Sequence, residues 1–126
     1  MDAAVYVKKL GNKKFPGVLF DPPFSLNQAV TLYNKYHKEK GKGLFCVKPS
    51  SMVYWSKLKD DIAKKIELGG ICISFGWNSM GLGKNRGFEQ IEILMVPHGG
   101  SRNDTIVVVE RKVARSFSKL KRSKNK

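Results

Sequence analysis

Asp21-Pro22-Pro23-Phe24 is the part of the sequence whose residue types and order could do chemistry. It follows an apolar run at residues 15–20, and because two prolines cannot continue a sheet ladder, we expect Asp21 at the carboxyl end of a strand. There its carboxylate can accept one hydrogen bond from an amino group, and the unpartnered Pro22 carbonyl can accept a second. Phe24 offers a flat ring for stacking a planar base. The motif therefore predicts a grip for an aromatic amine, with the nitrogen lone pair aimed at an electrophile.

The elements that must position this grip follow an α/β pattern. Short apolar runs at residues 15–20 and 71–75 are typical of buried strands. Helices are expected over residues 2–10, from the capping-box sequence at Ser25, and from about Ser50 or Ser51 to the Gly69-Gly70 pair. Strand, helix, Gly-Gly and strand in this order indicate a parallel βαβ unit.

A hairpin is expected at the end of the domain. Residues 88–96 and 105–110 have strand character, and the turn between them at 97–101 is too short to house a crossover, so the two strands should be antiparallel. The sequence thus predicts an α/β fold whose sheet is mostly parallel and ends in an antiparallel hairpin. We expect one domain over residues 1–112.

The charge distribution predicts a polyanionic partner. The 126 residues contain 24 Lys and Arg against 10 Asp and Glu, a net charge of +14, and no acid follows Arg111. We expect residues 113–126 to form a flexible basic tail that binds nucleic acid rather than a membrane, because the tail has few apolar residues to insert; a tail kept basic for solubility is the alternative. With no apolar run of about 20 residues and no signal-peptide pattern, we expect a cytoplasmic protein.

Further candidate residues follow the second strand and the Gly-rich loop after it. Ligands bind at the carboxyl ends of strands in open α/β sheets, so the side chains that follow residues 71–75 are expected to line a cofactor or base pocket; the alternative is that Trp77 packs under a loop. These residues are Trp77, Asn78 and Ser79. Basic residues of the loop and tail are expected to contact phosphates without reading sequence. They are Lys84, Arg86, Arg115, Lys119, Lys121 and Arg122.

No metal site is expected, because the two histidines, His37 and His98, lack clustered partners. Two cysteines, Cys46 and Cys72, are too few for a disulfide scaffold. We expect both to act as small buried hydrophobic residues.

Asp-Pro-Pro-aromatic directly after an apolar strand resembles the catalytic motif of the amino-methyltransferases, which methylate adenine N6 or cytosine N4 in DNA with S-adenosylmethionine. The resemblance extends over roughly a hundred residues. Residues 75–83, 97–100 and 103–106 are similar to the end of such domains. It implies that Asp21 and Pro22 hold the amino group of a flipped DNA base stacked near Phe24, that S-adenosylmethionine is the methyl donor, and that adenine N6 is the target.

One part of the family pattern is not found. The family binds its methyl donor on an earlier strand with a Gly-rich turn and an acid, but only 20 residues precede Asp21. The glycines at 81, 83 and 87 have the wrong spacing and lie too late in the chain. The resemblance therefore implies the C-terminal half of a methyltransferase domain, most of whose cofactor pocket would come from a partner.

The missing strand would leave residues 15–20 as an apolar sheet edge, which proteins normally cover. We expect the cover to be a separately encoded N-terminal half or a second copy of this chain. Two alternatives to an enzyme stay open: a non-catalytic nucleic-acid-binding protein on a decayed methyltransferase scaffold, and an assembly subunit whose edge strand is its interaction surface.

Overall fold

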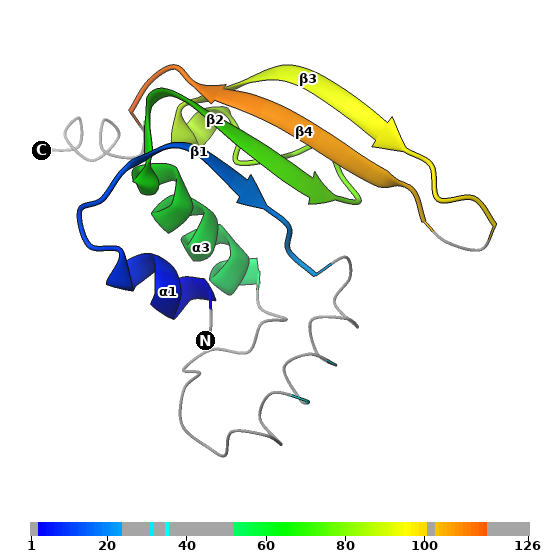
Figure 1. Cartoon of the computed structure of the whole chain (residues 1–126), viewed down its shortest axis with the longest axis horizontal. Coiled ribbons are helices and arrows are strands. Elements are labelled where there is room, and N and C mark those ends of the chain that lie inside the picture. Colours follow the sequence, from blue (N-terminus) through cyan, green and yellow to red (C-terminus); the bar gives the residue numbers. More distant parts are fainter. Residues whose placement is uncertain (1–2, 24–30, 32–34, 36–51, 101–102, 116–126) are drawn as a thin grey trace, which may run out of the picture.

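The computed structural model describes residues 3–23, 31, 35, 52–100 and 103–115, which form a sheet with two helices beside it (Figure 1). In chain order the elements are α1 (Ala3–Lys9), β1 (Phe15–Phe20), α3 (Met52–Lys65), β2 (Ile66–Gly76), the 3-10 helix η1 (Lys84–Arg86), β3 (Phe88–Val96) and β4 (Thr105–Lys112). Of the helix predicted from Ser25, the structure describes only Thr31 and Lys35, and both are helical. No described helix is long and apolar enough to cross a membrane.

The four strands lie in the order β1-β2-β4-β3. β1 pairs with β2 in parallel, whereas β4 is antiparallel to both β2 and β3. The predicted α/β class, the βαβ unit and the antiparallel hairpin are confirmed. Among the described strands the sheet is mixed, with parallel pairing only between β1 and β2, because the second strand of the hairpin inserts beside β2 and a hairpin is antiparallel by construction.

The helix before β2 ends earlier than the sequence predicts. α3 stops at Lys65, and residues 66–70 belong to β2. The Lys112 ammonium donates hydrogen bonds to the carbonyl oxygens of Ala63 (2.6 Å) and Ile66 (2.8 Å), which satisfies carbonyl groups that a helix end leaves without partners. Burial lowers the pKa of Lys112, and the nearby cations of Lys14 and Arg115 lower it further. The Lys112 ammonium of β4 therefore caps the end of α3. The sequence had predicted that the Gly69-Gly70 pair would end this helix.

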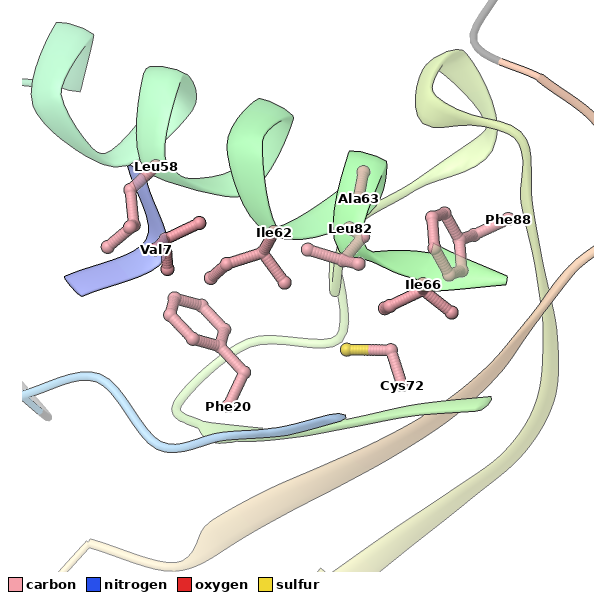
Figure 2. Packing of buried hydrophobic residues seen from close by; sticks show 9 residues of the cluster. All are labelled: Val7, Phe20, Leu58, Ile62, Ala63, Ile66, Cys72, Leu82 and Phe88. Carbon is pink, nitrogen blue, oxygen red and sulfur yellow. The ribbon is translucent and has the colours of Figure 1, made fainter. Parts of the chain in front are cut away.

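The hydrophobic core lies between the helices and one face of the sheet. α1 and α3 both lie on that face (Figure 1). Figure 2 shows the side chains that fill the space: Val7, Phe20, Leu58, Ile62, Ala63, Ile66, Cys72, Leu82 and Phe88. The opposite face carries no helix in the described part of the chain, and every residue of β3 after Phe88 is exposed. The core therefore holds α3 against β1 and β2, the two strands that end at the candidate site.

Cys72 should be chemically inert in the folded protein. Burial raises the pKa of its thiol to about 11, an effect that a contact with the Ser74 hydroxyl opposes only in part. Near pH 8 only about one thiol in a thousand would be the reactive thiolate, against a substantial fraction in an unfolded chain. In a Cys46→Ser variant, we expect alkylation by iodoacetamide to be slow in buffer and fast in denaturant. Equal rates in both conditions would contradict the buried position of Cys72.

Candidate functional site

The two parallel strands bring the predicted site residues to one end of the sheet. β1 ends at Phe20 and β2 ends at Gly76, and the register pairs Phe20 with Ser74, so residues 21–23 and 77–78 leave the sheet side by side. A small cavity of about 60 Å³ lies between them. Its lining residues are Phe20, Pro22, Pro23, Lys59, Ser74, Phe75, Gly76, Trp77, Asn78 and Gly81.

Asp21 lies beside this cavity, between two residues that line it, with its side chain exposed. In the part of the chain that the structure describes, its carboxylate has no hydrogen bond or ion pair, so its oxygens are available to a ligand. Pro22 and Pro23 are half-buried in the wall. Phe24, the predicted stacking surface, lies outside the described residues.

The predicted pocket residues after β2 separate into two groups. Trp77 and Asn78 line the cavity, whereas Ser79 does not. Trp77 is 67% exposed, which does not agree with the alternative that its ring packs under a loop. An exposed indole at the mouth of a cavity is a surface on which a flat ligand can stack. A role of Trp77, Asn78 and Ser79 in binding a cofactor stays a prediction.

Lys59 is a cavity residue that the sequence analysis missed. It lies on α3, and its ammonium donates a hydrogen bond to the Gly81 carbonyl at 2.8 Å. Burial lowers the pKa of Lys59, and the nearby Arg86 guanidinium lowers it further. In the sequence it is one of several lysines on a helix. Its spacing, four residues after Trp55 and three before the core residue Ile62, is the signal that could have placed it on the face toward the sheet.

A buried carboxylate holds the Gly-rich loop over the sheet. Glu110, fully buried on β4, accepts hydrogen bonds from the backbone N–H groups of Leu82 (2.7 Å) and Gly83 (2.9 Å). Gly81 has φ +53°, and a Cβ there would lie 2.3 Å from a Glu110 oxygen. The loop can approach Glu110 only because residue 81 has no side chain.

The predicted phosphate-binding residues lie elsewhere. Arg86 and Arg115 line a groove with Lys14, which lies at the other end of β1 from Asp21. Lys84 is exposed on η1. Lys119, Lys121 and Arg122 lie outside the described residues.

Arg86 is held by contacts within the protein. Its guanidinium donates to the Asp60 carboxylate at 2.7 Å, to the Leu82 carbonyl at 2.9 Å, and to the carbonyl and hydroxyl of Ser56, both at 3.1 Å. These bonds tie η1 to α3. Among the described residues, no cluster of three or more His, Cys, Asp or Glu side chains could hold a metal ion.

Sequence comparison finds no matching family model and no matching curated protein. Solved structures do match. TrmN from Thermus thermophilus aligns with 90% of this chain and 27% of its own, at 17% identity and a TM-score of 0.49. A Streptococcus mutans protein assigned as a S-adenosylmethionine-dependent methyltransferase aligns over 88% of this chain and 29% of its own, at 14% identity and a TM-score of 0.51.

A further match is SMU.776, described as a methyltransferase and solved with S-adenosylhomocysteine. It aligns over 87% of this chain and 30% of its own, at 14% identity and a TM-score of 0.51. At this identity the likeness establishes the fold: the chain has the architecture of one part of a methyltransferase-like α/β domain. It spans less than a third of the length of each of these proteins.

Replacing Gly81 should destabilise the protein more than replacing another glycine of the same backbone conformation. Gly81→Ala must displace the Glu110 carboxylate and weaken its two backbone hydrogen bonds. Gly99 has φ +64° and open space around it, so Gly99→Ala meets only the left-handed backbone cost of about 1–2 kcal/mol. In urea unfolding, we expect Gly81→Ala to lower the free energy of unfolding by about 1–3 kcal/mol more than Gly99→Ala does. Equal losses would mean that the Gly81–Glu110 contact is absent.

Proposed function

We propose that this chain is the base-holding part of a S-adenosylmethionine-dependent DNA amino-methyltransferase that acts on adenine N6. The observation that carries the proposal is the position of Asp21-Pro22-Pro23: it directly follows a strand in parallel pairing, next to a cavity whose other wall holds Trp77 and Asn78. The likeness of the fold to methyltransferases supports it independently of the motif.

The chain's own residues would bind and orient the target amine. The exposed Asp21 carboxylate accepts a hydrogen bond from one amine hydrogen, and the Pro22 carbonyl accepts the other, which turns the nitrogen lone pair away from both acceptors. Phe24, which directly follows the two prolines in sequence, and Trp77, which is exposed at the cavity, would stack on the base. Because cytosine N4 presents a similar amine to the same acceptors, the choice of adenine rests on the resemblance.

S-adenosylmethionine would supply an electrophilic methyl group. The described residues alone do not enclose a molecule of that size, since the cavity of about 60 Å³ is well below the roughly 300–1,000 Å³ of ligand pockets. Trp77 and Asn78 would form one wall of its site. Two structural neighbours named as methyltransferases, one solved with S-adenosylhomocysteine, support this choice of cofactor.

The open edge of the sheet is the place where the rest of the pocket would join. β1 is the edge strand of the described sheet, and its Leu19 side chain is 72% exposed. An apolar edge strand is a template for pairing with another strand. We propose that a complementary N-terminal methyltransferase half, or a second copy of this chain, pairs there and completes the cofactor site.

Loss of the Asp21 carboxylate should abolish methylation and spare DNA binding. In the chain combined with its complementary half, we expect Asp21→Ala to lower incorporation of labelled methyl groups into adenine-containing DNA by about 100-fold or more, because the amine is no longer oriented. DNA affinity, measured by fluorescence anisotropy, should not change. Glu67→Ala removes an exposed carboxylate near the amino end of β2, at the other end of the sheet, so it is the matched control and should retain full activity. Normal methylation by Asp21→Ala would exclude the proposed grip.

Cofactor binding should depend on the β1 edge. By calorimetry we expect no S-adenosylmethionine binding to this chain alone and measurable binding to the complex with its complementary half or to the dimer. Leu19→Lys places a charge on the edge and should prevent assembly in sedimentation velocity. Val53→Lys, at a position on α3 that is equally exposed (71%), should leave assembly intact. If S-adenosylmethionine binds to neither form, the enzymatic proposal fails.

A further inference from the structure

A second concave surface lies at the opposite end of the sheet from Asp21. It is a groove of about 660 Å³ bounded by the loop before β1, the last turns of α3, η1 and the end of β4. The residues that line it are Gly11, Asn12, Lys13, Lys14, Asp60, Ala63, Lys64, Lys65, Arg86, Lys112 and Arg115. We call it the basic groove, because seven of these side chains are cationic and one is acidic.

The positive charges of the basic groove are only partly balanced within the described part of the chain. Lys64 pairs with Asp61 at 3.4 Å. The single carboxylate of the groove, Asp60, is already paired with Arg86 at 2.7 Å. Lys13, Lys14 and Arg115 are exposed and have no carboxylate within ion-pair distance among the described residues. Crowded cations of this kind repel one another, and an anion placed among them removes that repulsion.

The walls of the groove are held in place before any ligand binds. The Lys65 ammonium donates to the Gly11 carbonyl and so ties α3 to the loop before β1. Lys112 ties β4 to the end of α3. The N–H groups of Val113 and Ala114 donate to the Gly87 carbonyl at 2.9 and 3.2 Å, which fixes the chain just before Arg115. A preformed surface does not spend binding free energy on ordering itself.

We infer that the basic groove binds the phosphate backbone of a nucleic acid. Its lining offers cations and backbone groups but only one aliphatic side chain, Ala63, so it has nothing to insert into a lipid layer. It is continuous with Arg115, after which the sequence adds five more basic residues and no acid. A long polyanion can neutralise the groove and that segment together, whereas a single small anion can neutralise only part of them.

The position of the groove makes it a remote anchor. Lys14 and Asp21 flank the six residues of β1, and seven steps of extended chain place them about 23 Å apart, which is roughly the length of seven base pairs of duplex. Phosphate contacts in the groove would hold the nucleic acid without contacting a base held near Asp21. The inference does not depend on methyl transfer: it holds equally for a protein that only binds nucleic acid.

The test compares two double variants with the same net charge. Lys14→Gln/Arg115→Gln removes two cations from the basic groove. Lys57→Gln/Arg111→Gln removes two exposed cations outside it; Arg111 alternates with the buried Glu110 and Lys112 along β4, so its side chain points to the other face of the sheet. The full chain is titrated by anisotropy with a fluorescent DNA duplex of arbitrary sequence over a series of salt concentrations.

We expect the groove variant to bind more weakly at low salt and its plot of log affinity against log salt to flatten by about 1.8, since each lost phosphate contact contributes about 0.9. The control variant should retain the slope of the unmodified chain. If the two double variants lose DNA affinity and salt slope equally, only the net charge determines binding and the inference is wrong. It is also overturned if the groove variant keeps its DNA slope but loses binding to phosphatidylserine vesicles, which would assign the groove to a membrane surface.

Discussion

The parallel pairing of β1 with β2 is the constraint on which the rest of the structure depends. Parallel strands end at the same edge of a sheet, so this single pairing places Asp21 and Trp77 beside one cavity although 55 residues separate them in sequence. It also sends the amino ends of both strands to the other edge, where the loop before β1 meets the end of α3. α3 stabilises the pairing by packing Leu58 and Ile62 across both strands. One register thus determines which residues share the candidate site and which share the basic groove.

Sequence reasoning located the strands because their signals are local. The apolar run before Asp21 and the short turn of the hairpin each depend on neighbouring residues, and each corresponds to a feature of the structure, whereas the Gly-Gly pair lies within β2. The end of α3 was placed too late, because its determinant is the Lys112 ammonium, which comes from a strand 47 residues beyond Lys65. No local pattern identifies a lysine that will bind a helix end across the fold.

The residues of the candidate site were likewise predictable from the sequence only where the signal is local. The position of Asp21-Pro22-Pro23 directly after β1 was predictable, because it follows from an apolar run and two prolines that are neighbours in the sequence; its role in holding an amine stays a proposal. Lys59 and Glu110 were not predictable, because their roles come from contacts with Gly81 and its neighbours that only the folded chain creates. The sequence also grouped Arg86 with the free cations of the molecule, whereas its guanidinium is committed to Asp60, Ser56 and Leu82. A count of charges cannot separate cations that hold the fold from cations that face a ligand.

Lys112 has a consequence that reaches beyond the end of α3. The same ammonium closes the helix and forms part of the wall of the basic groove, and the cations of Lys14 and Arg115 act against its charge. Binding of a polyanion in the groove, as proposed, would therefore be thermodynamically linked to the integrity of the helix end. A polyanion that settles between Lys14 and Arg115 relieves the repulsion on Lys112, so the folded state should gain in melting temperature as polyanion is added. A simple salt should also raise the melting temperature, but by less, because it only screens these charges.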